Sequence, residues 1–88
     1  MGIVTTLRAG AVRFRLYPQD HPPIHAHGRY AESLVIVQFE PDRSVTIAAH
    51  ADAVLPRNAK ANDIRKILEA AAERYDAIVA AWHKMHET

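Results

Sequence analysis

The stretch Leu34–Phe39 (LVIVQF) is the most strongly β-forming part of the chain. Its apolar residues run on without alternation, a pattern typical of a central strand that is covered on both faces. Glu40–Ser44 (EPDRS) follows it with the proline and small polar residues of a turn. We therefore expect the strand at 34–39 to lie at the centre of a sheet and to begin a hairpin.

Four other segments have strand character and would pair around this centre. Val12–Tyr17 (VRFRLY) alternates apolar and polar residues, and Gly10 before it suits a tight turn from a short strand at 3–7. Two prolines lead into a strand at 24–30, and residues 45–49 pair back after the turn. These segments predict an antiparallel sheet of about four to five strands.

The last third of the chain predicts one long amphipathic helix, with Asn62 as the favoured N-cap. Charged residues occupy much of one side, while apolar residues recur every three or four positions along the other. This apolar face consists of Ile64, Ile67, Leu68, Ala71, Tyr75, Ile78, Val79 and Trp82. The predicted fold class is therefore α+β, with the antiparallel sheet packed against one long C-terminal helix.

Length and composition predict a single α+β domain over residues 1–88. Apolar residues make up 49% of the chain and charged residues 24%, which argues against disorder. The lack of cysteine excludes disulfides and thiolate zinc sites and leaves histidine and carboxylate side chains as candidate ligands. No signal peptide is recognisable, and no stretch approaches the ~20 apolar residues that span a membrane, so we expect a cytoplasmic protein with no membrane partner.

The segment Asp20–His27 (DHPPIHAH) concentrates three histidines and one carboxylate around two prolines. On a strand, His25 and His27 project from the same face, roughly 7 Å apart. Asp20 can orient an imidazole and raise its basicity, or it can simply bond the backbone of a turn. We predict a catalytic or ligand site of His25 and His27, with Asp20 and His21 at its entrance.

A divalent metal such as zinc is the cofactor that this histidine pair would bind, with a third ligand from elsewhere in the chain. We favour His83 as that ligand, because it follows Trp82 on the predicted helix; Asp20 and His21 are alternatives. The simpler interpretation of His83 is that it lies in the last helical turn and complements the helix dipole.

A metal-free site is the alternative, in which histidines act as general acid and base on RNA. The net charge is only +1, yet residues 1–30 carry four arginines against one aspartate. Arg13, Arg15 and Arg29 could bind phosphate, and Tyr17 could stack on a base. The plain alternative is that these residues form an ordinary solvated strand face.

The segment Asp20–His27 resembles the D-H-x-P-P-H-x-H signature of the domain-of-unknown-function 4160 family, except that the two prolines follow His21 directly and Ile24 separates them from His25. The ending Ala80–His83 (AAWH) is similar to the end of that family's terminal helix. The resemblance implies a small bacterial protein, described as a component of toxin–antitoxin-like gene pairs. It implies no particular reaction.

Two functions follow from these patterns, one enzymatic and one not. The first is an interaction component of such a gene pair, which binds a small partner protein or forms a homodimer through its histidine face and sheet edges. The second is a histidine-based or metal-dependent ribonuclease that uses the arginines to bind RNA.

Overall fold

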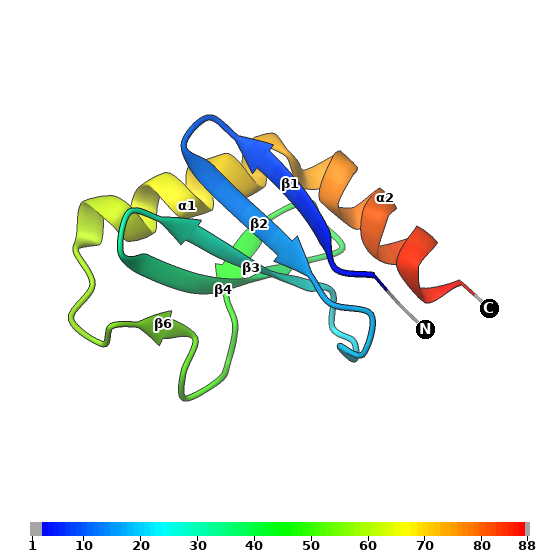
Figure 1. The fold of residues 1–88 in the computed structure, drawn as a ribbon, viewed down its shortest axis with the longest axis horizontal. Helices are drawn as coiled ribbons and strands as arrows, with labels where there is room; N and C mark the ends of the chain where they lie inside the picture. The colour runs from blue at the N-terminus through cyan, green and yellow to red at the C-terminus, as the bar shows by residue number, and fades with distance from the viewer. Residues whose placement is uncertain (1–2, 88) are drawn as a thin grey trace.

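Strand β4 (Ser33–Phe39) lies at the centre of the sheet, which confirms the prediction from its sequence. On one side it pairs with β3 (His25–Tyr30). On the other side its two halves pair with different strands, β5 (Val45–Ile47) and the two-residue β6 (Val54–Leu55). The structure is a computed structural model that describes residues 3–87, and Figure 1 shows the arrangement of its elements.

Strands β2 (Val12–Leu16) and β1 (Thr5–Ala9) extend the sheet beyond β3, and every neighbouring pair is antiparallel. The order is β1-β2-β3-β4-β5, with β6 beside β5 on the same edge of β4. The predicted antiparallel sheet is confirmed, but β6 forms in a segment for which the sequence predicts no strand. The first strand lies two residues later than predicted, because the turn at Gly10 pairs Ala9 with Val12.

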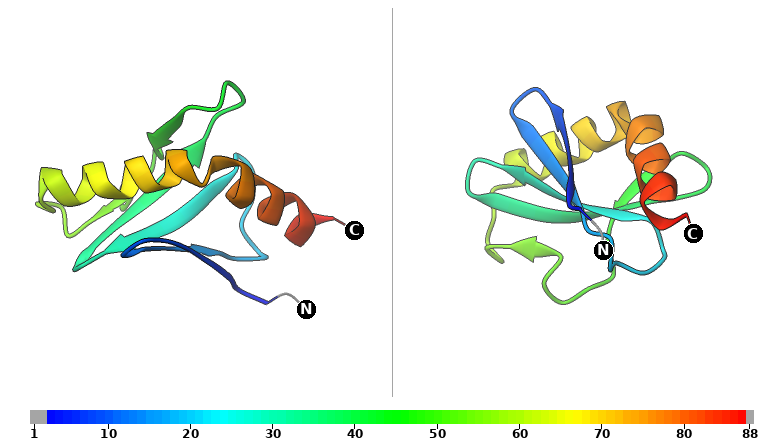
Figure 2. Two further views of the ribbon diagram at one scale, coloured as in Figure 1. Left: turned by 90° about the horizontal axis from the view of Figure 1, so that it is seen from above. Right: turned by 45° about the vertical axis from the view of Figure 1, so that its right-hand side comes forward.

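One face of the sheet is covered by a single layer of two helices, α1 (Ala61–Glu73) and α2 (Tyr75–His86) (Figure 2). The largest fully buried side chains lie between the layers: Phe14, Leu16, Val35, Val37, Ile67 and Ile78. On the opposite face of β4, Leu34, Ile36 and Gln38 are only half-buried. The prediction that this strand is covered on both faces is therefore wrong, and its outer face is available for a site.

The prediction of one long C-terminal helix is also wrong, because the helix is interrupted at Arg74. Arg74 has φ −102° and ψ 19°, outside the range of a regular helix. Hydrogen bonds still run from Arg74 N–H to the Ala70 carbonyl and from Ile78 N–H to the Arg74 carbonyl, so the interruption is a bend. α2 therefore turns toward the segment that joins β2 and β3, as Figure 2 shows.

Contacts on both sides of the bend hold the helices in place. The Tyr75 hydroxyl donates to the Glu40 carbonyl, and Arg43 forms a two-bond ion pair with Asp76, so the start of α2 is attached to the β4–β5 turn. At the other end, α1 begins at Ala61 after Lys60, and its N-cap makes no side-chain bond. Asn62 is thus inside the helix, and its predicted role as N-cap is wrong.

Candidate functional site

The segment between β2 and β3 places Asp20 over the outer face of β3. Pro18 follows the end of β2, and the Asp20 N–H donates to the Tyr17 carbonyl at 3.1 Å in a turn. His25 and His27 share the outer face of β3, because Ala26 between them is fully buried toward the helices. The predicted strand and the turn before it therefore bring one carboxylate to two imidazoles.

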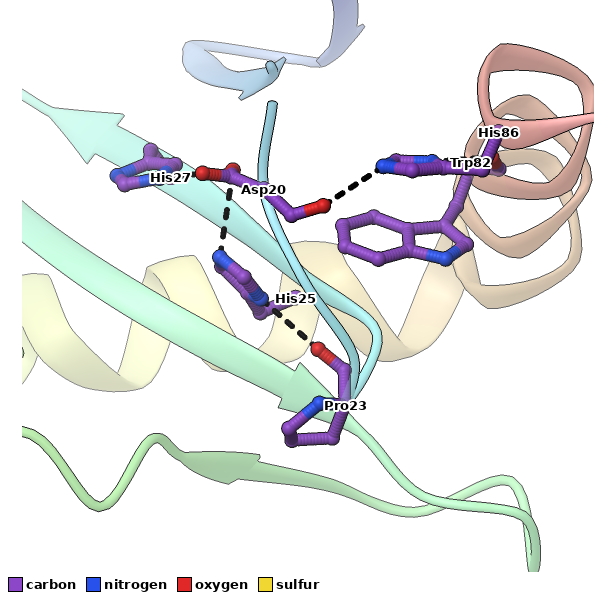
Figure 3. Close-up of polar contacts among 6 residues, drawn as sticks. All are labelled: Asp20, Pro23, His25, His27, Trp82 and His86. Carbon is purple, nitrogen blue, oxygen red and sulfur yellow. Dashed lines mark hydrogen bonds and ion pairs between the residues drawn. The ribbon is translucent and has the colours of Figure 1, made fainter. Parts of the chain in front are cut away.

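The carboxylate of Asp20 lies between the two rings (Figure 3). Its Oδ2 atom is 3.2 Å from His25 Nε2 and 3.5 Å from His27 Nε2. One ligand atom from each of the three residues lies within 4.8 Å of the other two. We call Asp20, His25 and His27 the triad.

The tautomer of His25 is fixed by its other nitrogen. Nδ1 lies 2.9 Å from the Pro23 carbonyl, which only accepts hydrogen bonds, so Nδ1 carries the hydrogen. In a neutral ring Nε2 then has a lone pair that faces the negatively charged Asp20 Oδ2. A cation between the two atoms, either a proton or a metal ion, turns this repulsion into attraction. Metal-bound histidines are oriented by such a bond from the second nitrogen.

Burial disfavours a positive charge on the His27 ring. Burial lowers the pKa of His27 below 6.5, and the opposing attraction of Asp20 is a smaller effect. His27 Nε2 and Asp20 Oδ2 are both buried, and neither forms a hydrogen bond among the described residues. Unbonded buried polar atoms are rare, and a shared ion would satisfy both atoms at once.

The far end of α2 closes over this loop. The ring nitrogens of His86 lie 2.9 Å from the Asp20 carbonyl and 2.8 Å from the Trp82 carbonyl, so the ring links the loop to the helix. The same ring stacks on Trp82 with centroids 4.0 Å apart, and Trp82 in turn lies 5.3 Å from the His25 ring. The i, i+3 spacing of His83 and His86 predicts that both share a helix face near Trp82 and could approach the histidine pair, but the sequence favours His83 over His86.

A cavity of about 400 Å³ opens beside the triad. Its other walls combine apolar side chains with polar ones that can form hydrogen bonds. They are formed by His21, Pro23, Ile36, Gln38, Ala48, Ala49 and His50. His50, for which the sequence suggests no role, thus comes near the site from the segment after β5.

A smaller groove of about 140 Å³ lies on the other side of His27. It is lined by Arg13, Arg15, Tyr17, His27, Arg29 and Leu34. Strand pairing explains this grouping, because Arg15 lies opposite His27 and Arg13 lies opposite Arg29. Tyr17 packs edge-on against the His27 ring, with centroids 4.9 Å apart. The four predicted ligand-binding residues are thus neighbours of the triad.

The family model named "Domain of unknown function (DUF4160)" matches residues 12–83 of the chain. The chain belongs to the DUF4160 family. No curated protein and no solved structure matches it. The matched segment contains the triad and the arginine groove of this DUF4160 protein, whereas His86 lies beyond it. Within residues 3–87, no helix is long and apolar enough to cross a membrane.

Only some of the predicted metal ligands of the DUF4160 chain lie close together. His25 and His27 share the triad, and its third member among the described residues is Asp20. His83 is exposed on α2 and is not part of this group, since it is His86 that turns toward the loop. His21 is exposed at the rim of the cavity. Their chemical roles remain predictions.

Proposed function

We propose that this DUF4160 protein is a zinc-dependent hydrolase whose ion is held by Asp20, His25 and His27. The observation that carries the proposal is the position of Asp20 Oδ2, at 3.2 and 3.5 Å from two imidazole Nε2 atoms. Two of these three atoms are buried without a hydrogen bond. Two histidines and one carboxylate are a common ligand set for catalytic zinc.

The donor set favours zinc over a hard octahedral ion such as magnesium. Two of the three ligand atoms of the triad are imidazole nitrogens, which suit zinc, whereas magnesium prefers oxygen ligands.

Three protein ligands leave the fourth zinc position open, which is the arrangement of catalytic rather than structural zinc sites. With zinc held by Asp20, His25 and His27, the site would supply water activated near neutral pH and a Lewis acid for an oxygen of the substrate. The cavity beside the triad offers room for a substrate, and His21 and His50 line it as candidate proton carriers. The proposed catalytic residues are therefore the triad, with His21 and His50 as candidate proton carriers.

A metal-free ribonuclease is the enzymatic alternative. In that case a proton lies between His25 and Asp20, and the 3.2 Å contact is an imidazolium–carboxylate pair. His27, whose pKa is lowered by burial, would then serve as the general base. This version predicts RNA cleavage that persists in a chelator, whereas the zinc version predicts that activity is lost.

A non-enzymatic function is supported by the edge of the sheet. β1 is the outermost strand, and its free edge pairs with no other strand in residues 3–87. An open edge can accept a strand from another chain. The proposed occupant is a small partner protein of a toxin–antitoxin-like gene pair in the cytoplasm, or a second copy of this chain. Co-purification with the product of the adjacent gene and the mass in solution test these two occupants.

Elemental analysis of protein purified without a histidine tag tests the zinc proposal. We expect about one zinc ion per chain in the wild type and well under half of that in His25→Ala and Asp20→Asn. His83→Ala is the matched control, because it removes an exposed histidine outside the triad. Equal zinc in all four proteins, or none in the wild type after zinc is supplied, would overturn the proposal.

A further inference from the structure

The outer face of the sheet carries a row of arginines that face one another. Arg8 of β1 lies opposite Arg13 of β2, which in turn lies opposite Arg29 of β3. Like charges directly opposite on neighbouring strands are destabilising. None of these side chains forms an ion pair within the part of the chain that the structure describes. The row is thus a concentration of positive charge without an internal partner.

The groove beside His27 turns this charge into a site of defined shape. Two guanidinium groups of the row, those of Arg13 and Arg29, line it. Arg15, which lies opposite His27, adds a third. Guanidinium groups bind phosphate through paired hydrogen bonds. No carboxylate lines this groove among the described residues, and that of Asp20 faces the histidines instead.

His27 lines both the arginine groove and the larger cavity. A molecule that fills both sites therefore contacts the triad, with one part in the positively charged groove and the other part in the largely uncharged cavity. The cavity supplies apolar walls from Ile36 and Ala48 and polar groups from Gln38 and His50. Its volume of about 400 Å³ lies at the lower end of the range for small-molecule sites.

We infer that the substrate is a phosphate ester of a nucleoside, with its phosphate in the arginine groove and its base in the cavity. This inference rests on the proposed function, because the ester bond would then lie at the triad. Both a free nucleotide and the end of a single strand have this chemistry. A flat base with polar edges suits walls that mix apolar side chains with hydrogen-bonding groups.

The reaction implied is hydrolysis of the ester bond that joins the phosphate to the nucleoside. The oxygen of water forms a bond to phosphorus, and the bond between phosphorus and the sugar oxygen breaks. One proton of the water ends on that sugar oxygen, which leaves as an alcohol, and the rest of the water stays with the phosphate. The phosphate product is inorganic phosphate from a free nucleotide and a phosphomonoester from the end of a strand. No oxidant or reductant is needed.

Binding to four probes tests the inference: inorganic phosphate, adenosine 5′-monophosphate, a single-stranded RNA decamer and a DNA decamer of the same sequence. Each is titrated into tag-free protein by nuclear magnetic resonance, with zinc and with chelator. We expect adenosine monophosphate or a decamer to bind at least ten times more tightly than inorganic phosphate. Equal affinity for inorganic phosphate would overturn the role of the cavity. The decamers tell a strand from a free nucleotide.

Arginine variants test the groove. In Arg13→Gln/Arg29→Gln we expect affinity for the preferred probe to fall at least tenfold. The slope of log affinity against log salt concentration should become shallower by about one to two. Arg13→Lys/Arg29→Lys should recover part of that loss, and Arg65→Gln on α1 is the control outside the groove. Unchanged affinity in the glutamine variant would overturn the inference.

The same variants separate this inference from the zinc proposal. Zinc content should stay at the wild-type level in both arginine double variants, because no arginine is part of the triad. Zinc binding without arginine-dependent affinity for the probes would sink the substrate assignment and leave the zinc centre standing. Arginine-dependent affinity in a protein that binds no zinc would sink the hydrolase and leave the nucleotide site.

Discussion

The indole of Trp82 lies against the imidazole of His25, with ring centroids 5.3 Å apart. The two residues are 57 positions apart in the sequence and meet because α2 turns at Arg74 toward the loop that carries Asp20. Trp82 is also the only tryptophan of the chain and is almost fully buried. Its fluorescence therefore reports on the triad.

Binding of a paramagnetic divalent ion at the triad should quench the fluorescence of Trp82. We expect titration of the tag-free protein with Co²⁺ to lower the emission by at least half and to saturate near one equivalent, because the tryptophan ring contacts a ligand ring. Zn²⁺ added first should prevent the quenching. The same saturable quenching in Asp20→Asn/His25→Ala would place the ion elsewhere, and His83→Ala, which should behave as wild type, is the control.

Removing the His86 contacts should loosen the Asp20 loop. His86→Phe keeps a ring to stack on Trp82 but loses the contacts to the Asp20 and Trp82 carbonyls. We expect about 1–2 kcal/mol less stability against urea, because each hydrogen bond contributes about 1 kcal/mol. Zinc affinity should fall about tenfold, as for other residues that support metal ligands.

His83→Phe is the matched control for this variant, since it adds the same ring at an exposed position three residues earlier on α2. It should change neither the stability nor the zinc affinity. If both variants behave alike, the link between His86 and Asp20 has no effect on the site.

Stability of the metal-free protein should fall as the pH drops below 6.5. Burial lowers the pKa of His27 in the folded state, so the unfolded chain takes up its proton first. The loss begins near pH 6.5 and is complete below the lowered pKa of the folded protein. Urea unfolding in chelator at pH 7.5, 6.5 and 5.5 should show a shallower decline for His27→Gln than for the wild type. An identical decline would mean that burial of His27 does not affect the pH dependence.

Gly28→Ala should destabilise the contact between the sheet and α1. A Cβ atom at this position would lie 2.6 Å from Ile67 Cγ2 and 2.9 Å from Phe14 Cε1, and both side chains are fully buried. We expect a loss of about 1–3 kcal/mol in the free energy of unfolding, the usual cost of overpacking. Thermal unfolding measures this loss. Ala72→Gly, a substitution at an exposed helix position that should cost about 1 kcal/mol, is the comparison.

The sequence predicts the sheet well because its signals are local. Alternation in Val12–Tyr17 and the apolar run of Leu34–Phe39 depend only on neighbouring residues, and both strands form where the pattern indicates. The spacing of apolar residues continues unbroken across the bend at Arg74. A prediction from this spacing alone therefore extends one helix through Arg74. This is why one long helix is predicted and two are found.

The site is less predictable because it depends on contacts between distant segments. The pairing of His25 with His27 on one face follows from strand geometry. The contact of Asp20 with His86 joins residues 66 positions apart, and its formation instead of one with His83 depends on the direction of α2 after the bend. His50 approaches the cavity through a loop whose path has no sequence signal.

X-ray absorption at the zinc edge tests the central claim most directly. The sample is tag-free protein loaded with one equivalent of zinc, desalted, and compared with Asp20→Asn. We predict zinc ligands at about 2.0–2.1 Å that comprise two imidazole nitrogens and oxygen atoms, with zinc retained poorly by Asp20→Asn. Zinc that washes out of the wild type, or a set of three imidazoles unchanged in Asp20→Asn, would contradict the claim that Asp20, His25 and His27 form the metal centre.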